Sequence, residues 1–487
     1  MNTISRVKLL GLIEPQHHQN LIESEFEVLS LDASELLTSD RLDLAFKLLY
    51  IDLKEINSDY ADALYREHLS AMNLGSFIEP GNKDKNSFKK YQEEFLSIYQ
   101  SIKKLGFNIE KSIVPLSDTG SILNGSHRVA SAISLKKDIK CINLNLPTDI
   151  YNYQLFKKRA ISKSMLQHAV NKYIEYADDV YIAFVWPSAQ GYDEDLDELI
   201  QNAIYKESIY LTKNGAHNLL SQIYKGEAWL GKKEDNYNGV IGKLNACFKY
   251  DKPVRVFAFN AKNFDDVLKL KENVREVFKL GKHSIHITDT KQEAVDISNM
   301  IFNKNGVHFL NYAKPNKFRD TQSKIEKFKT FVSNNKLNIK DFTLDSGIVL
   351  SVYGLRKSND IDYFSSIEIN EMTNESIDNH DSELVYHKEE KENLIYNPEL
   401  YFIYEGVKFV AFDQVYKMKQ NRAEQKDIND CRMMRSMINN NSIDIYRLRI
   451  NQKLIYNRIK FKIYLVQALK KLSLYESVRY IYRIFKR

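Results

Sequence analysis

Apolar and polar residues alternate along the middle of this chain in a pattern typical of a mixed α/β domain. Short apolar runs predict five strands, at 180–186, 208–212, 254–259, 283–287 and 307–310. Apolar residues at helical spacing predict three intervening helices, at 195–204, 264–278 and 291–302. Strands that alternate with helices are typical of a mainly parallel sheet. Residues 178–312 are therefore predicted to form an α/β domain, to which no family is assigned.

The C-terminal pattern predicts two amphipathic helices. The first has an apolar stripe at Ile455, Ile459, Ile463 and Val466. Ser473 and Glu476 have the spacing of a capping box that would begin the second.

Charge is concentrated in this same C-terminal segment. Residues 446–487 contain 12 Lys and Arg and one acidic residue, a net charge of +11, whereas the whole chain carries +6. The remaining 445 residues therefore carry −5, which disfavours a nucleic-acid-binding body. Basic helices with aromatic and aliphatic faces bind anionic membranes, and this is the expected partner of residues 446–487. The alternatives are a helical hairpin packed on the body or on another subunit, and a nucleic-acid-binding tail.

Length and composition indicate a multidomain protein. The 487 residues suffice for about three domains, and a hydrophobic content of 43% allows sizeable cores. Three widely spaced cysteines have no metal-site or redox spacing, which favours a reducing cytoplasm. The apolar run 9–13 is too short for a signal peptide, and no stretch approaches the length needed to span a bilayer.

Candidate chemistry is clearest at residues 354–362, which read Gly-Leu-Arg-Lys-Ser-Asn-Asp-Ile-Asp. The apolar residues 347–353 before this run predict a strand that ends at Gly354. In an extended segment, Asp360 and Asp362 would point to the same face. Two such carboxylates repel each other unless a cation lies between them, and Mg²⁺ prefers oxygen ligands of this kind. A surface turn is the alternative interpretation, because Asn-Asp is common turn chemistry.

This run resembles the signature of the DNA polymerase β-type nucleotidyltransferase superfamily, in which a glycine and a small polar residue precede Asp-x-Asp. The resemblance covers residues 316–437 and departs from the family at Leu355, where serine is usual, with Ser358 three positions later. It implies that Asp360 and Asp362 bind Mg²⁺ or Mn²⁺ and that a nucleoside triphosphate is the substrate. Nucleotide contacts are then expected from Gly354, Arg356, Ser358, Lys419 and Arg422.

The resemblance also implies a third catalytic carboxylate on a later strand. Asp378, Asp381 and Glu383 are the candidates, and Asp381 is preferred. The spacing of Lys419, Arg422 and Lys426 predicts that they share one face of a helix that follows the core.

A second motif lies at residues 120–135, where Gly125, Ser126, His127 and Arg128 follow a short predicted strand at 121–123. A helix is predicted to begin near Ser126. Free backbone N–H groups at a helix start bind anions, and Gly125 would allow close approach. His127 and Arg128 would add hydrogen-bond donors and charge. The alternative is that Ser126 only caps the helix and that His127 and Arg128 are structural.

This motif is similar to the Gly-x-His-Arg run of the ParB/sulfiredoxin-like fold, and the resemblance covers residues 75–147. It implies a site for the phosphates of a nucleotide at Gly125, Ser126, His127 and Arg128. Ser126 stands where sulfiredoxins have cysteine, so their redox activity is not implied. Some members of this fold are small-molecule kinases, and others bind nucleotide or DNA.

Together these patterns predict a multidomain protein of α/β and α+β class. Its expected parts are a ParB/sulfiredoxin-like domain (1–150), a helical connector (151–177), a central α/β domain (178–312), a polymerase-β-like nucleotidyltransferase domain (313–440) and a basic helical tail (441–487). The expected function is Mg²⁺-dependent nucleotidyl or phospho transfer to a small molecule or glycan, in the cytoplasm or on the inner membrane face. The architecture resembles that of bacterial capsule and cell-surface polysaccharide biosynthesis proteins. A ParB-like nucleic-acid-binding protein and a toxin- or defence-type nucleotidyltransferase acting on RNA or protein remain alternatives.

Overall fold

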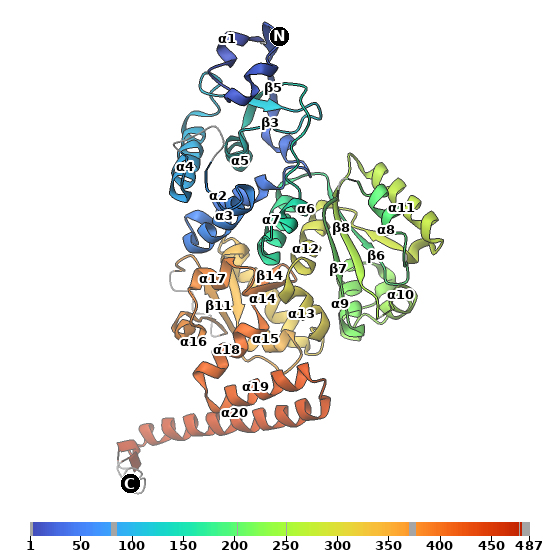
Figure 1. The fold of residues 1–487 in the computed structure, drawn as a ribbon. Helices are drawn as coiled ribbons and strands as arrows, with labels where there is room; N and C mark the ends of the chain where they lie inside the picture. Colours follow the sequence, from blue (N-terminus) through green and yellow to red (C-terminus); the bar gives the residue numbers. More distant parts are fainter. Residues whose placement is uncertain are drawn as a thin grey trace. The chain divides into compact units, whose positions relative to one another are not determined.

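The computed structural model describes residues 3–78, 85–201, 203–249, 251–369, 376–476 and 478–479. It is a mixed α/β protein with several small sheets, as expected (Figure 1). Contacts divide the chain into two compact units. Unit 1 comprises residues 1–311 and 392–408, and unit 2 comprises residues 312–391 and 409–487. The finer domain boundaries drawn from the sequence stay predictions.

The N-terminal part of unit 1 is built on a small three-stranded sheet. Its central strand β5 (Asp138–Asn143) pairs antiparallel with β3 (Leu29–Asp32) and parallel with β4 (Val114–Leu116). A two-stranded sheet lies beside it, formed by β1 (Thr3–Ser5) and β2 (Glu25–Glu27). The helices of this part are α1 (Arg6–Leu9), α2 (Asp43–Lys54), α3 (Ser58–Met72), α4 (Phe88–Leu105), α5 (Ser126–Ser134), α6 (Tyr153–Lys158) and α7 (Lys163–Tyr176). The predicted helix start at Ser126 is confirmed, whereas the predicted strand 121–123 is reduced to a single bridge between Leu116 and Ile122.

The middle part of unit 1 contains a four-stranded sheet in the order β7-β8-β6-β9. Its strands are β6 (Val180–Val185), β7 (Ala203–Ile209), β8 (Val254–Asn260) and β9 (Ile285–Ile287). Every neighbouring pair is antiparallel, so the prediction of a mainly parallel sheet is wrong. A helix between two strands can return the chain to either end of a sheet, and alternation in the sequence therefore does not fix strand direction. The helices are α8 (Asp193–Leu199), α9 (Lys213–Ile223), α10 (Val240–Cys247), α11 (Phe264–Phe278), α12 (Lys291–Ile301) and α13 (Lys304–Tyr312).

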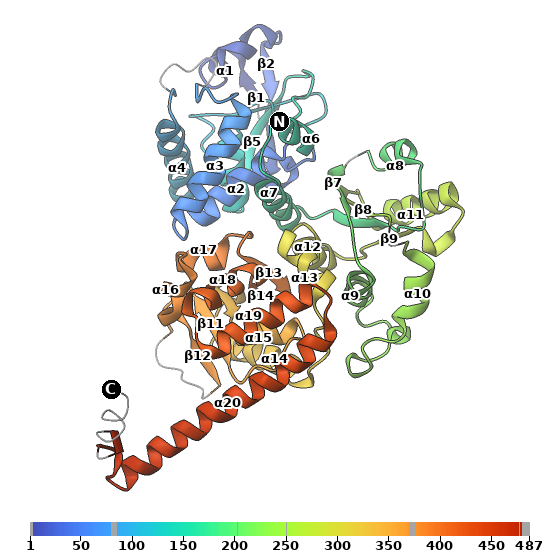
Figure 2. The same cartoon turned by 60° about the horizontal axis from the view of Figure 1, so that its bottom comes forward.

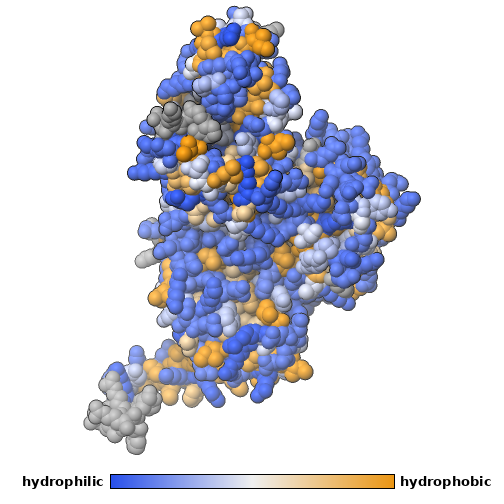
Figure 3. Space-filling view, in the orientation of Figure 1, coloured by the Kyte–Doolittle hydropathy of each residue, from blue (hydrophilic) through white to orange (hydrophobic). Residues whose placement is uncertain are grey.

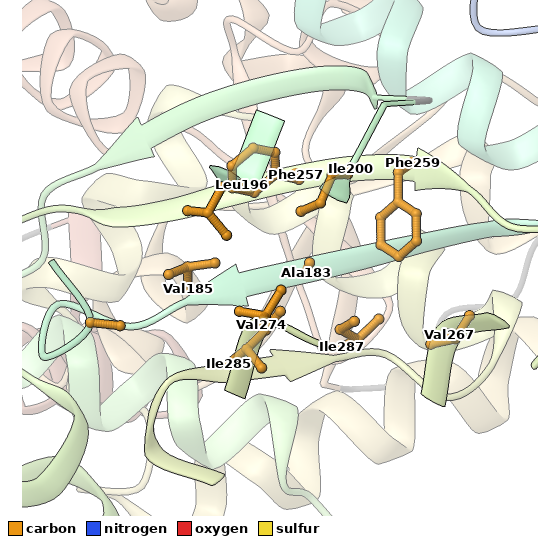
Figure 4. Packing of buried hydrophobic residues seen from close by; sticks show 11 residues of the cluster. Ala183, Val185, Leu196, Ile200, Phe257, Phe259, Val267, Val274, Ile285 and Ile287 are labelled. Carbon is orange, nitrogen blue, oxygen red and sulfur yellow. The ribbon is translucent and has the colours of Figure 1, made fainter. Parts of the chain in front are cut away.

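One face of this sheet and two helices form a dense apolar core (Figure 4). Alternate residues of the strands point into it, as the two-residue period of a strand requires. Ala183 and Val185 of β6 meet Ile285 and Ile287 of β9, and the core is closed by buried residues of α8 and α11, namely Leu196, Val267 and Val274.

Two apolar runs that predicted strands are helices instead. Residues 307–310 lie in α13, whose start is fixed by Asn303, because its side chain accepts hydrogen bonds from the backbone N–H groups of Asn305 and Gly306. Residues 347–352 form α15 (Gly347–Val352), in which all six residues are buried. A short run that is apolar on every side has no two-residue or 3.6-residue period, so the pattern could not separate helix from strand.

Unit 2 is built around strands in the order β12-β11-β10-β14. These strands are β10 (Phe342–Asp345), β11 (Ile361–Ser365), β12 (Ile377–Asn379) and β14 (Val407–Val410), which follows β13 (Tyr401–Tyr404) through a tight turn. The helices are α14 (Arg319–Asn334), α15, α16 (Leu384–His387), α18 (Phe412–Arg422), α19 (Gln425–Ile438) and α20 (Ser442–Lys471), whereas α17 (Lys391–Tyr396) belongs to unit 1 except for its first residue. Phe328 of α14 packs on Phe342 and Tyr363, which places this helix on one face of the sheet.

Most of the described part of the basic C-terminal segment is one long helix. The 30 residues of α20 replace the shorter first helix of the predicted pair (Figure 2). The predicted second helix lies largely outside the described residues. Among the residues that the structure describes, no helix is both long and apolar enough to cross a bilayer.

A glycine pair in and beside α10 tests this packing. A Cβ added at Gly239 would lie 1.9 Å from the carbonyl oxygen of Trp229, whereas nothing lies within 4 Å of a Cβ at Gly242. We expect Gly239→Ala to lower the free energy of unfolding by about 1–3 kcal/mol because the backbone must shift. Gly242→Ala, the matched control, should raise it by about 0.5–1 kcal/mol through helix propensity. Urea denaturation measures both, and equal effects would contradict the predicted clash.

Candidate functional site

The candidate site of unit 2 lies where three neighbouring strands bring carboxylates into register. Asp345, the last residue of β10, is directly opposite Asp362 of β11 in an antiparallel pair. Asp362 is in turn paired with Asp378 of β12, which runs parallel to β11. Paired residues of adjacent strands project to the same face, so these three side chains form a row across the sheet. Asp360 immediately precedes β11 and adds a fourth carboxylate.

The electrostatics of Asp362 reflect this crowding. Burial raises the pKa of the Asp362 carboxyl to about 6. The neighbouring charges of Asp360 and Asp345 add to the rise, whereas His380 and Lys419 oppose it. A carboxylate that is costly to ionise among other carboxylates gains from a bound cation.

Two histidines meet Asp345, and the sequence patterns indicated neither of them. Asp345 is fully buried, and its Oδ2 lies 2.7 Å from Nδ1 of His380 and 3.0 Å from Nε2 of His387. Burial lowers the pKa of His380, but the hydrogen bond and charge of Asp345 outweigh it and leave that pKa above its usual value. Burial also raises the pKa of Asp345, but both histidines together hold it well below its usual range. His380 and His387 are 35 and 42 positions from Asp345 in the sequence, so no local spacing could have revealed this contact.

The preferred third carboxylate, Asp381, lies outside the row. It belongs to a 3₁₀ turn (Asp381–Glu383), and its Oδ2 lies 3.0 Å from the Nζ of Lys391. Glu383 is paired with Arg422 at 3.1 Å. Among the three candidates, Asp378 alone is in register with Asp362. Within the described part of the chain, no three or more His, Cys, Asp or Glu side chains are grouped so that they could hold a metal ion.

The basic residues expected at a nucleotide are engaged in buried ion pairs. Arg356 makes a two-point contact with Asp430 at 2.8 and 2.9 Å. Lys419 lies 3.0 Å from Asp430 and 3.2 Å from Asp427, and Arg422 makes two contacts of 2.9 Å with Asp427. The structure thus gives each of the three a role in packing.

Lys426 does not share a helix with Lys419 and Arg422. The predicted helix breaks after Arg422 at Ala423, which has a positive φ of 53°, and Lys426 lies at the start of α19. The prediction that the three residues share one helix face is therefore wrong.

Gly354 and Ser358 are also explained by internal packing. Gly354 has a φ of 72°, and a Cβ there would lie 2.8 Å from the backbone oxygen of Lys314. Its carbonyl oxygen accepts a hydrogen bond from Arg449 at 2.6 Å. The hydroxyl of Ser358 donates to the backbone oxygen of Asp360, which orders the approach to β11. Of the predicted site residues, Asp360 and Asp362 remain the ones without such an internal explanation.

The second motif lies at a cavity of unit 1. This cavity has a volume of about 560 Å³ and is lined by residues of α4 and by the segment that begins α5. The lining of that segment consists of Asn124, Gly125, Ser126, His127 and Arg128. Gly125 is the N-cap of α5 with a φ of 87°, so the alternative in which Ser126 caps the helix is wrong. Lys85 and Lys111 also line the cavity, and Lys85 lies 3.3 Å from Glu94.

His127 and Arg128 have different roles at this cavity. His127 Nε2 lies 2.7 Å from the Tyr65 hydroxyl, and the imidazole packs on Phe95 with ring centroids 4.5 Å apart. Burial lowers the pKa of His127 well below its usual value, and nearby Lys85 and Lys47 lower it further, so the ring is neutral. The Arg128 guanidinium lies against Gly125, where a Cβ would be 2.8 Å from Nη2. The glycine therefore permits the arginine to cover the helix start.

The raised pKa of Asp362 predicts a pH-dependent stability. Its folded-state pKa of about 6 exceeds the ordinary value of 3.8, so the folded state favours the protonated form. The stability that this preference contributes is complete below pH 3.8 and is lost as the pH rises through 6. We expect Asp362→Asn to raise the free energy of unfolding at pH 8 by at most about 3 kcal/mol and to change it little at pH 4. Thermal denaturation at both pH values tests this. The control is the variant Asp413→Asn, which changes an exposed residue.

Comparisons with protein-family models, curated proteins and solved structures found no match for this chain.

Proposed function

We propose that unit 2 is a Mg²⁺- or Mn²⁺-dependent nucleotidyl- or phospho-group transferase that uses a nucleoside triphosphate. The observation that carries this proposal is the row Asp345, Asp362 and Asp378, with Asp360 at the start of the central strand. Two carboxylates together with substrate phosphates are the usual ligands of Mg²⁺ in such enzymes.

The donor set suits a hard divalent ion. Asp360 and Asp362 would hold it, and Oδ1 of Asp345 is buried without a hydrogen-bond partner beside them in the sheet register. When bound, the ion would orient the reacting phosphate and offset the charge that develops during in-line displacement. Asp345 holds the His380 ring in one orientation, and the charge on that ring partly balances Asp362.

The acceptor class follows from the rest of the chain. A body that carries −5 does not attract nucleic acid, which favours a small molecule or glycan over RNA. The positive charge of residues 446–487 suits a reaction at the inner membrane face, as in the synthesis of a cell-surface polysaccharide.

A second nucleotide site is proposed at the cavity beside Gly125 and Arg128. It combines the start of α5 with two lysines and an arginine, which together suit the phosphates of a nucleotide. A kinase-like reaction there could supply the phosphorylated group that unit 2 transfers.

Replacing the paired aspartates tests the transferase. We expect Asp360→Asn and Asp362→Asn each to lower Mg²⁺-dependent turnover of nucleoside triphosphates by about 100-fold or more, because metal stabilisation of the transition state is worth several kcal/mol. Turnover is measured with glycan, small-molecule and RNA acceptors, as pyrophosphate release for nucleotidyl transfer and as nucleoside diphosphate release for phospho transfer. Asp413→Asn removes the same charge from an exposed position and should retain wild-type turnover. Unchanged turnover in the Asp360 and Asp362 variants would overturn the metal assignment.

A separate experiment addresses the cavity of unit 1. Arg128→Ala should weaken ATP binding by about 10-fold, which corresponds to the loss of one charge-assisted hydrogen bond. Calorimetric titration of the Asp360→Asn protein isolates this site from unit 2. Lys103→Ala, an exposed change on the same domain, should bind ATP as the parent does. If the two variants bound ATP with equal affinity, the proposed phosphate site in the N-terminal domain would be contradicted.

A further inference from the structure

The helix α20 has two apolar stripes on opposite sides. With 100° between successive residues, Leu448, Gln452 and Ile455 share one side, and these three are the buried residues of the helix. This inward stripe packs against α19. The apolar stripe that the sequence pattern predicts, Ile455, Ile459, Ile463 and Val466, continues this side of the helix. Ile455 is covered by the protein, whereas Ile459 and Ile463 are exposed.

The outward stripe lies about half a turn away and runs along most of the helix. It consists of apolar and aromatic residues at positions 443, 446, 450, 454, 461 and 464, interrupted at Asn457. All six are exposed, from 50% at Ile450 to 85% at Ile443, with Tyr464 at 72%. Apolar colour continues along the end of α20 in Figure 3. Because the two apolar stripes lie on opposite sides, their contributions to the hydrophobic asymmetry of the helix cancel. The helix as a whole is therefore not strongly amphipathic.

Cations border the outward stripe on both sides. Lys453, Lys460 and Lys471 lie along one border, and Arg447 and Arg458 lie along the other. No acidic residue occurs between Asp444 and Glu476. An apolar stripe between two rows of long basic side chains allows the cations to reach a polar, anionic layer while the stripe is buried.

A groove beside the first half of the stripe adds further positive charge. It has a volume of about 690 Å³ between α19 and α20 and is lined by Arg432, Arg435 and Arg447 together with Ile450 and Leu454 of the outward stripe. The acidic side chain in this groove, Asp444, accepts a hydrogen bond from Ser436. Apolar residues and arginines therefore meet at one surface.

We propose that the outward stripe of α20 and this arginine groove dock unit 2 on an anionic lipid bilayer, with the helix parallel to the membrane plane. The stripe enters the boundary between headgroups and acyl chains, and the arginines bind lipid phosphates. A second copy of the chain is disfavoured as the occupant, because two such helices repel each other. Nucleic acid would leave the apolar stripe in water. The proposal is independent of the chemistry proposed for the aspartates.

Vesicle flotation tests the proposal with the full chain. We expect the protein to float with vesicles of phosphatidylcholine and 30% phosphatidylglycerol but not with pure phosphatidylcholine, and 0.5 M salt should weaken the binding. The stripe variant Tyr446→Ser, Phe461→Ser, Tyr464→Ser should lose binding. The groove variant Arg432→Gln, Arg435→Gln, Arg447→Gln should bind about 100-fold more weakly, at roughly fivefold for each cation.

The controls change exposed apolar and basic residues of unit 1. Ile22→Ser with Leu105→Ser, and Lys89→Gln with Lys103→Gln and Lys269→Gln, should bind as the wild type does. Because every substituted residue is exposed, melting temperatures should be unchanged. Four results would overturn the proposal. They are wild-type protein that stays unbound, a stripe variant that still floats, a dimer in sedimentation that only the stripe variant dissociates, and preferential binding of the same surface to DNA in competition with the vesicles.

Discussion

The pairing of a fully buried aspartate, Asp430, holds unit 2 together. Its carboxylate receives Arg356 from the segment before β11 and Lys419 from α18. An unpaired charge at this depth would cost several kcal/mol, so the three elements must stay together for the unit to fold. The same buried ion pairs therefore order the loop that ends at Asp360 and fix the position of α19. Since α20 packs on α19, the basic surface of the C-terminus also depends on this buried pairing.

This network changes the physical meaning of the charged residues in and around 354–362. Arg356, Lys419 and Arg422 have the charge that a triphosphate needs, but their guanidinium and ammonium groups already have carboxylate partners. A substrate phosphate would have to compete with these buried carboxylates for their cations, which is costly. In the proposed transferase, charge for a phosphate would therefore come from a metal at Asp360 and Asp362 or from the ring of His380. Both depend on Asp345, which is next to Asp362 in the sheet and bonded to His380.

Local signals in the sequence predicted local structure well. The bounds of α11 agree with the predicted helix, and the start of α5 follows from a glycine before an apolar periodic segment. Strand direction in the middle sheet was not accessible, because it depends on which strands become neighbours. The buried runs that became α13 and α15 lacked a period that could distinguish helix from strand. For the site, the Asp360–Asp362 pair was visible in the sequence, whereas His380 and His387 meet Asp345 only through the fold.

The tail shows how periodicity alone can select the wrong face. A single apolar stripe on an isolated helix marks the side that will be buried, but it does not say whether protein or lipid buries it. In α20, α19 covers the first part of the stripe that contains Ile455, and the opposite side, with Tyr446 and Phe461, is exposed to a partner. Arg447 and Arg458 on one border of that exposed side and Lys453, Lys460 and Lys471 on the other bring their charges to one surface. A surface that is apolar in the middle and cationic at both edges matches the cross-section of an anionic bilayer, from acyl chains to phosphates, more closely than it matches a flat polyanion.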